Sequence, residues 1–144
     1  MSKLSYQELT ANNLMFRMLN QEAREHVVRL AKQRSYQDGE LIIKQGAPDQ
    51  DVYLLRKGKV DVQVSQEGFE VELNTLEPGT IFGELAEVAH VPRTASVLAI
   101  GEVEVLCFPG PELVEELRRH PTASKLLDHI VKRRVIDTTE KTFN

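Results

Sequence analysis

The stretch from Phe82 to Val97 carries the clearest combination of chemical groups in this sequence. Gly83 is followed by Glu84, and Arg93 stands nine positions after that acid. A glycine turn or the start of a short helix exposes backbone N–H groups that can bind an anion. A guanidinium can bind a phosphate with two parallel hydrogen bonds. A carboxylate repels a phosphate, so the acid needs another partner, such as a ribose hydroxyl. The stretch therefore suits a small ligand with one phosphate, one free ribose hydroxyl and a flat base.

The elements that must position this stretch begin with helices, which we expect over residues 5–33. Asn12 or Asn13 can cap a short turn over residues 14–19, and Asn20 is a better cap for the helix that follows. After Asn20, apolar positions fall on one helical face at Ala23, Val27, Leu30 and Ala31. We expect these helices to pack on a β core.

From residue 34 to residue 108 the pattern changes to strands and turns. Lys57-Gly58 is expected to end one strand, and Val60, Val62 and Val64 then alternate with polar residues, as in a half-buried strand. Glu67-Gly68 is a turn, and the returning strand alternates at Phe69, Val71 and Leu73. Turn signals recur about every 8–12 residues, which favours a sandwich or barrel.

Two further strands, over residues 95–99 and 102–108, are expected before the C-terminal helices. These helices occupy residues 109–137, and Pro109 and Pro111 open the first of them, where a missing N–H is harmless. His120-Pro121 separates it from a last helix that begins near Ala123 and ends soon after Val135. Residues 138–144 lack an apolar stripe and are expected to fray.

The bulk composition fits one domain over residues 1–144. With 41% hydrophobic residues, the chain is long enough to bury a core. Its net charge of −4 argues against a nucleic-acid-binding surface, which is usually basic. It has no apolar run of membrane-spanning length and no N-terminal signal core, so a cytoplasmic protein is expected. Its single cysteine, Cys107, lies in an apolar run and is expected to be buried. The four histidines lack metal-ligand spacing, so we expect no metal site. We also expect no cofactor.

The sequence of residues 82–86 followed by Pro92-Arg93-Thr94-Ala95 resembles the phosphate-binding cassette of cyclic-nucleotide-binding domains. That family includes kinase regulatory subunits, the sensor half of the catabolite activator protein and ion-channel tails. The resemblance extends from about Leu14 to His120 and places the cassette at residues 82–95. It implies a mainly β fold, a jelly-roll-like β roll over residues 34–108 flanked by N-terminal helices and two C-terminal helices.

The resemblance also assigns roles in a site for cyclic AMP or cyclic GMP. It implies that Arg93 pairs with the cyclic phosphate and that Glu84 accepts a hydrogen bond from the ribose 2′-hydroxyl. Backbone N–H groups from Gly83 through Leu85 to Ala86, at the start of a short helix, would face the ribose and phosphate. The remaining contacts would come from Thr94 and Ala95, near the phosphate, and from Leu73 and Val62, against the base. Thr94 does not decide between the two bases, and Leu73 and Val62 can equally be plain core residues.

Two positions depart from the family pattern. Asp49 stands where the family prefers a small residue, and Glu87 stands where its pattern is nearly always aliphatic. An unpaired buried carboxylate is costly, so Glu87 either faces solvent, meets a cation or alters the cassette. Its charge can weaken cyclic-nucleotide affinity or leave room for a different ligand.

We therefore expect a stand-alone cyclic-nucleotide sensor, without enzymatic activity, that signals to a separate protein effector through its C-terminal helices. The alternative is an interaction module that has kept the fold and lost or changed its ligand. No element after residue 135 is expected to supply a DNA-recognition helix, so the chain alone should not bind DNA specifically. The terminal helices are also a candidate homodimer contact, with Leu127, Ile130 and Val131 on one side.

Overall fold

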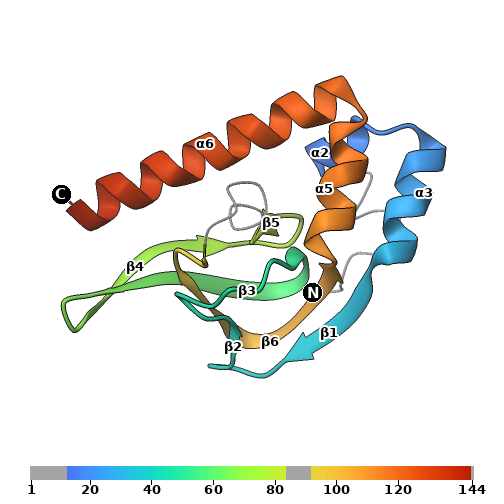
Figure 1. Cartoon of the computed structure of the whole chain (residues 1–144). Coiled ribbons are helices and arrows are strands. Elements are labelled where there is room, and N and C mark those ends of the chain that lie inside the picture. Colours follow the sequence, from blue (N-terminus) through green and yellow to red (C-terminus); the bar gives the residue numbers. More distant parts are fainter. Residues whose placement is uncertain (1–12, 84–91, 144) are drawn as a thin grey trace.

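The computed structural model describes residues 13–83 and 92–143, with side chains up to residue 133. In this part of the chain one antiparallel sheet is flanked by helices (Figure 1). Its path runs β1-β6-β3-β4, while β2 pairs with β6 and β5 pairs with β3. The strands are β1 (Lys32–Tyr36), β2 (Leu41–Ile43), β3 (Val52–Gln66), β4 (Phe69–Leu76), β5 (Ile81–Phe82) and β6 (Ser96–Phe108). The mainly β class with flanking helices is confirmed.

Two strands are longer than the sequence predicts. β3 continues through Gly58, and β6 continues through Gly101, where we had expected strand ends. Both glycines have positive φ, +85° and +69°, and the β3–β6 register shifts between Leu55 and Lys57 and again between Lys57 and Lys59, across Gly58. A Cβ on Gly58 would lie 2.3 Å from the carbonyl oxygen of Glu102. The glycines therefore bend paired strands, as at β-bulges, and do not end them.

The start of β3 and the end of β6 are buried on both faces of the sheet. Successive side chains alternate, so Val52 and Leu54 join an apolar cluster with the helices, while Tyr53 and Leu55 join a second cluster inside the roll. Phe16 from the helices packs against Phe108 of β6, with ring centroids 5.7 Å apart. The doubly buried strands thus fix the helices relative to the interior of the roll.

The N-terminal helices in the described residues are α2 (Leu14–Arg17) and α3 (Gln21–Leu30). Asn13, one of the two candidates for the first cap, accepts a hydrogen bond from the N–H of Met15, and Asn20 accepts one from that of Ala23, so a cap is confirmed at each helix start. The Asn13 side chain also donates to the carbonyl of Gly79, which ties α2 to the turn before β5.

The C-terminal helices are α5 (Gly110–Arg118) and α6 (Pro121–Phe143). The break at His120-Pro121 is confirmed, but the predicted end of the last helix near residue 135 is wrong, because α6 continues to Phe143. Figure 1 places α2, α3 and α5 at one end of the sheet and α6 running from there past β4, which it contacts. Within the described residues, no helix combines the length and apolar character that crossing a bilayer requires.

Candidate phosphate-binding site

Arg93 is a buried cation held by the protein backbone and by one carboxylate. Its side chain is 2% exposed. Nη1 donates to the carbonyl oxygen of Gly83 at 2.7 Å, and Nη2 donates to the carbonyl of Asp51 at 2.7 Å and to Asp49 Oδ2 at 2.8 Å. Nε is buried and has no hydrogen-bond partner among the described residues. A buried guanidinium with an unused N–H is prepared to bind an anion.

Gly83 is the residue whose shape lets Arg93 come this close. Its φ is +87°, a conformation that side chains rarely adopt. A Cβ at this position would lie 2.9 Å from Arg93 Nη1, 3.0 Å from the carbonyl oxygen of Asp51 and 3.2 Å from Ile43 Cδ1. The glycine is therefore required both by its backbone conformation and by the space that the guanidinium occupies.

A loop between β2 and β3 holds the backbone of Arg93 in register. The N–H of Gly46 donates to the carbonyl of Arg93 at 2.8 Å, and the N–H of Arg93 donates to the carbonyl of Ala47 at 2.9 Å. The N–H of Gln45 also donates to Ser96 Oγ at the start of β6. The same loop carries Asp49, so it supplies both the backbone frame and the counter-ion of the arginine.

Asp51 connects this arginine to the interior of the roll. Its carbonyl accepts from Arg93, and its Oδ2 accepts from the thiol of Cys107 at 3.6 Å. Burial, followed by the charge of the Asp51 carboxylate, raises the pKa of Cys107 to about 11. Burial also raises the pKa of Tyr53, beside it, well above its usual range. Cys107 is therefore a buried neutral thiol, as the sequence predicts.

The remaining predicted residues that the structure describes lie on neighbouring segments. Thr94 is exposed and Ala95 half-buried, directly after Arg93. Val62, on β3, pairs with Val97 of β6 and packs against the cluster inside the roll. Leu73, on β4, is buried at a register shift between β3 and β4. Glu84, Leu85, Ala86 and Glu87 lie outside the described residues, so their predicted roles stay predictions.

Asp49 and Asp51 are the partners of Arg93 that sequence reasoning missed. Asp49 carried a signal, because it departs from the family pattern, but nothing in the sequence pairs it with an arginine 44 positions away. The backbone carbonyl of Asp51 carried none, because any residue type provides a carbonyl.

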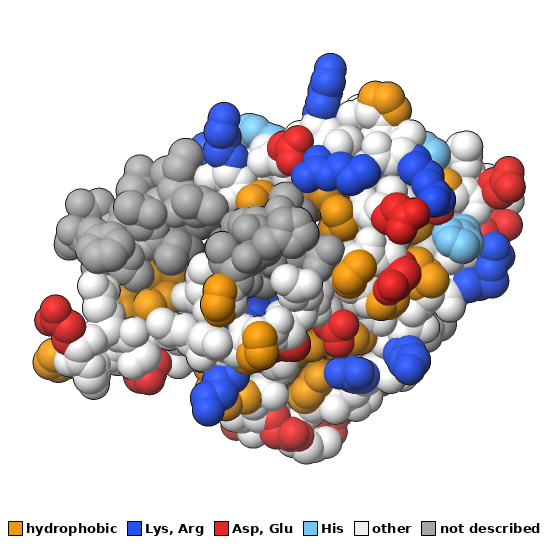
Figure 2. All heavy atoms as spheres, in the orientation of Figure 1, with side chains coloured by type: hydrophobic (Ala, Val, Ile, Leu, Met, Phe, Trp, Pro, Cys, Tyr) orange, Lys and Arg blue, Asp and Glu red, His pale blue; other side chains and the backbone are white. Residues whose placement is uncertain are grey.

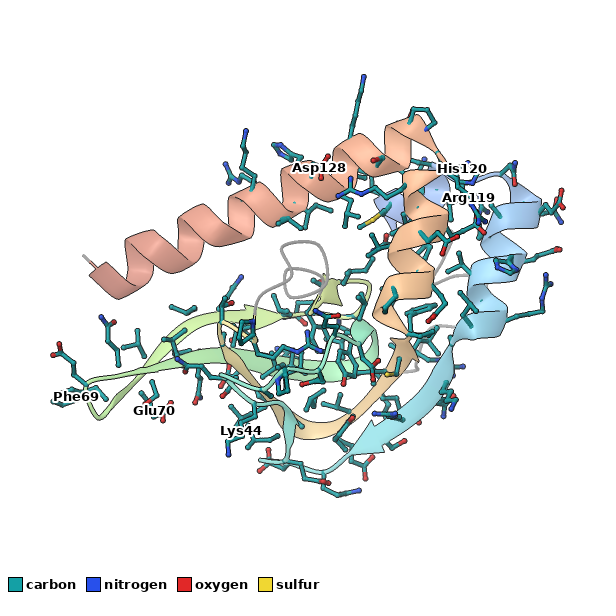
Figure 3. The ribbon with its side chains drawn as sticks, viewed as in Figure 1. Lys44, Phe69, Glu70, Arg119, His120 and Asp128 are labelled. Carbon is teal, nitrogen blue, oxygen red and sulfur yellow. The ribbon has the colours of Figure 1, made fainter. Side chains whose placement is uncertain are left out.

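A separate cavity of about 450 Å³ lies between α3 and α5. Glu116 is buried there, with Arg119 Nη1 and His120 Nε2 each at 3.4 Å and His26 Nε2 at 3.7 Å. Figure 3 shows Arg119 and His120 at the corner between α5 and α6, beside α3. In sequence, the spacing of Glu116 and His120 was the available signal. None of the predicted site residues lines this cavity.

Charges on the helical end are mixed. Figure 2 shows basic and acidic side chains interspersed over it, and surface ion pairs such as Arg119–Glu115, at 2.7 Å, join several of them. In the described residues, no group of three His, Cys, Asp or Glu side chains is arranged to hold a metal ion.

Comparisons with known proteins agree with this geometry. The cyclic nucleotide-binding domain profile matches residues 33–120. The cAMP-dependent protein kinase type II regulatory subunit of Drosophila melanogaster is 39% identical over 112 residues, which cover 78% of this chain and 30% of that protein. This chain spans about a third or less of the length of the curated relatives it matches.

Solved structures share the fold. The Thermus thermophilus catabolite activator protein has a TM-score of 0.74 at 29% identity, over 85% of this chain and 58% of that one. The regulatory domain of Toxoplasma gondii PKA, crystallised with cAMP, has a TM-score of 0.78 at 22% identity, over 89% of this chain and 49% of that one. These structures match the antiparallel sheet with its N-terminal helices and two C-terminal helices.

Proposed function

The chain belongs to the cyclic nucleotide-binding domain family, and we propose that it binds a cyclic nucleotide at Arg93, with cyclic AMP as the first candidate and cyclic GMP as the second. The observation that carries this proposal is the buried guanidinium beside Gly83, whose Nε–H has no partner among the described residues. The relative from Drosophila melanogaster is named as a regulatory subunit of a cAMP-dependent protein kinase, which favours that ligand. In this proposal the chain acts as a non-catalytic binding module.

In this proposal the ligand spans the segment around Arg93 and the neighbouring strands. Arg93 holds the phosphate, assisted by N–H groups of residues 83–86 and of Thr94 and Ala95, and Glu84 holds the ribose hydroxyl. Val62 and Leu73 offer apolar surface to the base. Support comes from pairing: Val62 lies opposite Val97, four residues after Arg93, and β4 lies next to β3.

We further propose that binding is transmitted through α5 and α6 to a separate protein effector in the cytoplasm. A ligand shifts a conformational equilibrium only if it binds the two states with different affinity. The long helix α6 contacts both α2 and β4, so a change at the sheet can reach the helices. Leu127 and Val131 are buried in the chain's own helical cluster. A homodimer contact through α6 stays a prediction, and it would have to use other residues of this helix.

A second candidate function is an interaction module with a changed or lost ligand. The observation that favours it is Asp49, whose carboxylate already occupies Nη2 of Arg93. The acid at position 87, outside the described residues, points in the same direction. In this case the roll would be retained for its surface, and Arg93 would serve as a structural cation.

A ligand panel separates the two candidates. Cyclic AMP, cyclic GMP, cyclic dinucleotides and 5′-AMP are titrated into the whole chain by calorimetry, with thermal shift as a second readout. The sensor proposal expects saturable binding of a cyclic mononucleotide and much weaker binding of 5′-AMP. Absence of binding and of any thermal shift across the panel would favour the interaction module. A gel shift with duplex DNA at physiological salt should give no specific complex.

A further inference from the structure

We propose that Asp49 is an internal competitor for the ligand's phosphate, and that its carboxylate lowers this chain's affinity for a cyclic nucleotide. The inference rests on the proposed function, because it concerns the same arginine. It assigns a role to a residue outside the cassette at 82–95, in the loop between β2 and β3.

The hydrogen-bond capacity of Arg93 is the first argument. A guanidinium has five N–H groups: one on Nε and two on each terminal nitrogen. Both N–H groups of Nη2 are used, by Asp49 Oδ2 and by the carbonyl of Asp51, and one on Nη1 is used by the carbonyl of Gly83. Among the described residues, the N–H groups of Arg93 left without an acceptor are the one on Nε and the second one on Nη1.

A bidentate phosphate needs two parallel N–H groups on one edge of the guanidinium. Each such edge includes one N–H of Nη2, paired with either Nε or Nη1. Since both N–H groups of Nη2 have acceptors, no complete edge is free. A phosphate can therefore bind bidentately only if Asp49 or the carbonyl of Asp51 gives up its hydrogen bond.

Asp49 is the acceptor that can leave. The carbonyl of Asp51 belongs to the backbone just before β3 and is fixed by the strand that follows. The side chain of Asp49 is 48% exposed, whereas that of Arg93 is 2% exposed, so a displaced carboxylate can turn into water at little cost. The guanidinium cannot follow it, because the carbonyl of Gly83 holds Nη1 and the carbonyl of Asp51 holds the second N–H of Nη2.

Charge adds to this competition. A carboxylate 2.8 Å from Nη2 neutralises the arginine and would repel the phosphate from the same edge. The small residue that the family pattern prefers at position 49 would bring neither effect. Asp49 thus distinguishes this chain from the family pattern at the point where the phosphate would bind.

The test compares cyclic AMP affinity in the whole chain and in Asp49→Asn, Asp49→Ala, Arg93→Ala and Glu102→Gln by calorimetry. Asparagine keeps the shape of Asp49 and removes its charge, and alanine also removes the acceptor. Glu102→Gln is the matched control, because it neutralises another acid, one paired with Lys57 at 3.3 Å in an exposed ion pair on β6. Melting temperatures without ligand verify the fold, and the asparagine variant suffices if the alanine variant does not fold.

We expect both Asp49 variants to bind cyclic AMP about tenfold more tightly than the wild type, which is a gain of about 1.4 kcal/mol in binding free energy. Glu102→Gln should bind like the wild type. Added inorganic phosphate should also compete with cyclic AMP more strongly in Asp49→Asn.

Two results would overturn the inference and are distinguishable. If the wild type binds, Arg93→Ala loses binding and Asp49→Asn binds equally or more weakly, then Asp49 positions the arginine and does not compete. If neither the wild type nor either Asp49 variant binds cyclic AMP, the proposed function itself is wrong, and the inference falls with it.

Discussion

Nη1 of Arg93 donates a hydrogen bond to the carbonyl oxygen of Gly83 at 2.7 Å, so both residues from opposite ends of the predicted cassette meet. Gly83 precedes the segment at 84–91, and Arg93 follows it. This hydrogen bond ties together the two ends of a segment whose N–H groups are proposed to face the ligand.

Gly83→Ala should destabilise the protein more than Gly39→Ala. Both glycines have positive φ, +87° and +82°, so both variants carry the strain of that conformation, about 1–3 kcal/mol. A Cβ at Gly83 would meet Arg93 Nη1 and Asp51, whereas a Cβ at Gly39 would have no atom of the described residues within 4 Å. We expect roughly 1–3 kcal/mol of additional loss at Gly83 in chemical denaturation. Equal losses would show that Arg93 is not held against Gly83.

Arg118→Ala should loosen α6 from α5. Nη1 of Arg118 donates to Ser124 Oγ at 2.8 Å and to the carbonyl oxygen of Ser124 at 3.1 Å. Nη2 donates to Asp128 Oδ1 at 2.7 Å. Asp128, labelled in Figure 3, lies along α6 beyond the corner. Losing these bonds should cost about 1 kcal/mol and speed amide hydrogen exchange in α6.

The control for this prediction is Arg119→Ala, which removes ion pairs to Glu115 and Glu116 within α5 and should leave exchange in α6 unchanged. Similar amide hydrogen exchange of α6 in the Arg118 and Arg119 variants would contradict the role of Arg118 in holding α6 to α5. The hydrogen bond from Arg118 lowers the pKa of Asp128, so this ion pair is present at neutral pH and is lost as pH falls through that pKa.

The thiol of Cys107 should react slowly with a disulfide reagent in the folded protein at pH 8 and rapidly after unfolding. Its pKa is raised from 9.0 to about 11, and only the thiolate is nucleophilic. Between these values the unfolded chain has lost the proton that the folded chain keeps, so stability falls as pH rises from 9 to about 11.

Cys107→Ala should reduce the slope of stability against pH in that window, measured by urea denaturation at several pH values. The variant also leaves a small cavity, which lowers stability equally at every pH. An unchanged slope, or a thiol that reacts as fast folded as unfolded, would contradict a buried neutral Cys107.

Local signals made much of the fold predictable. The caps Asn13 and Asn20 were found because a short polar side chain satisfies free N–H groups at any helix start. The break at Pro121 followed equally from proline's own geometry. The predicted strand ends at Gly58 and Gly101 are wrong, because a glycine with positive φ occurs both in turns and in β-bulges. Which of the two it forms depends on the pairing with the partner strand. Phe69 was expected on a half-buried strand, but it lies exposed at the tip of the β3–β4 hairpin (Figure 3), beyond the core.

The site was predictable where the motif is local. Gly83 and Arg93 were identified from one short stretch, and the structure brings them together. Asp49 lies on a distant loop, and its ion pair with Arg93 depends on how that loop pairs with the segment before β6. α6 also continues beyond the end that its apolar positions predict, since each further residue adds a hydrogen bond once a helix has begun.

The most direct test of the account is calorimetric titration of cyclic AMP into the wild type, Arg93→Ala and Arg29→Ala. Arg29 is an exposed arginine on α3 and serves as the charge-matched control. Melting curves without ligand verify that each variant is folded. The account predicts that Arg93→Ala loses roughly 2–4 kcal/mol of binding free energy, because a charge-assisted bidentate contact disappears, while Arg29→Ala binds like the wild type. Equal affinity of the wild type and Arg93→Ala for cyclic AMP would contradict it.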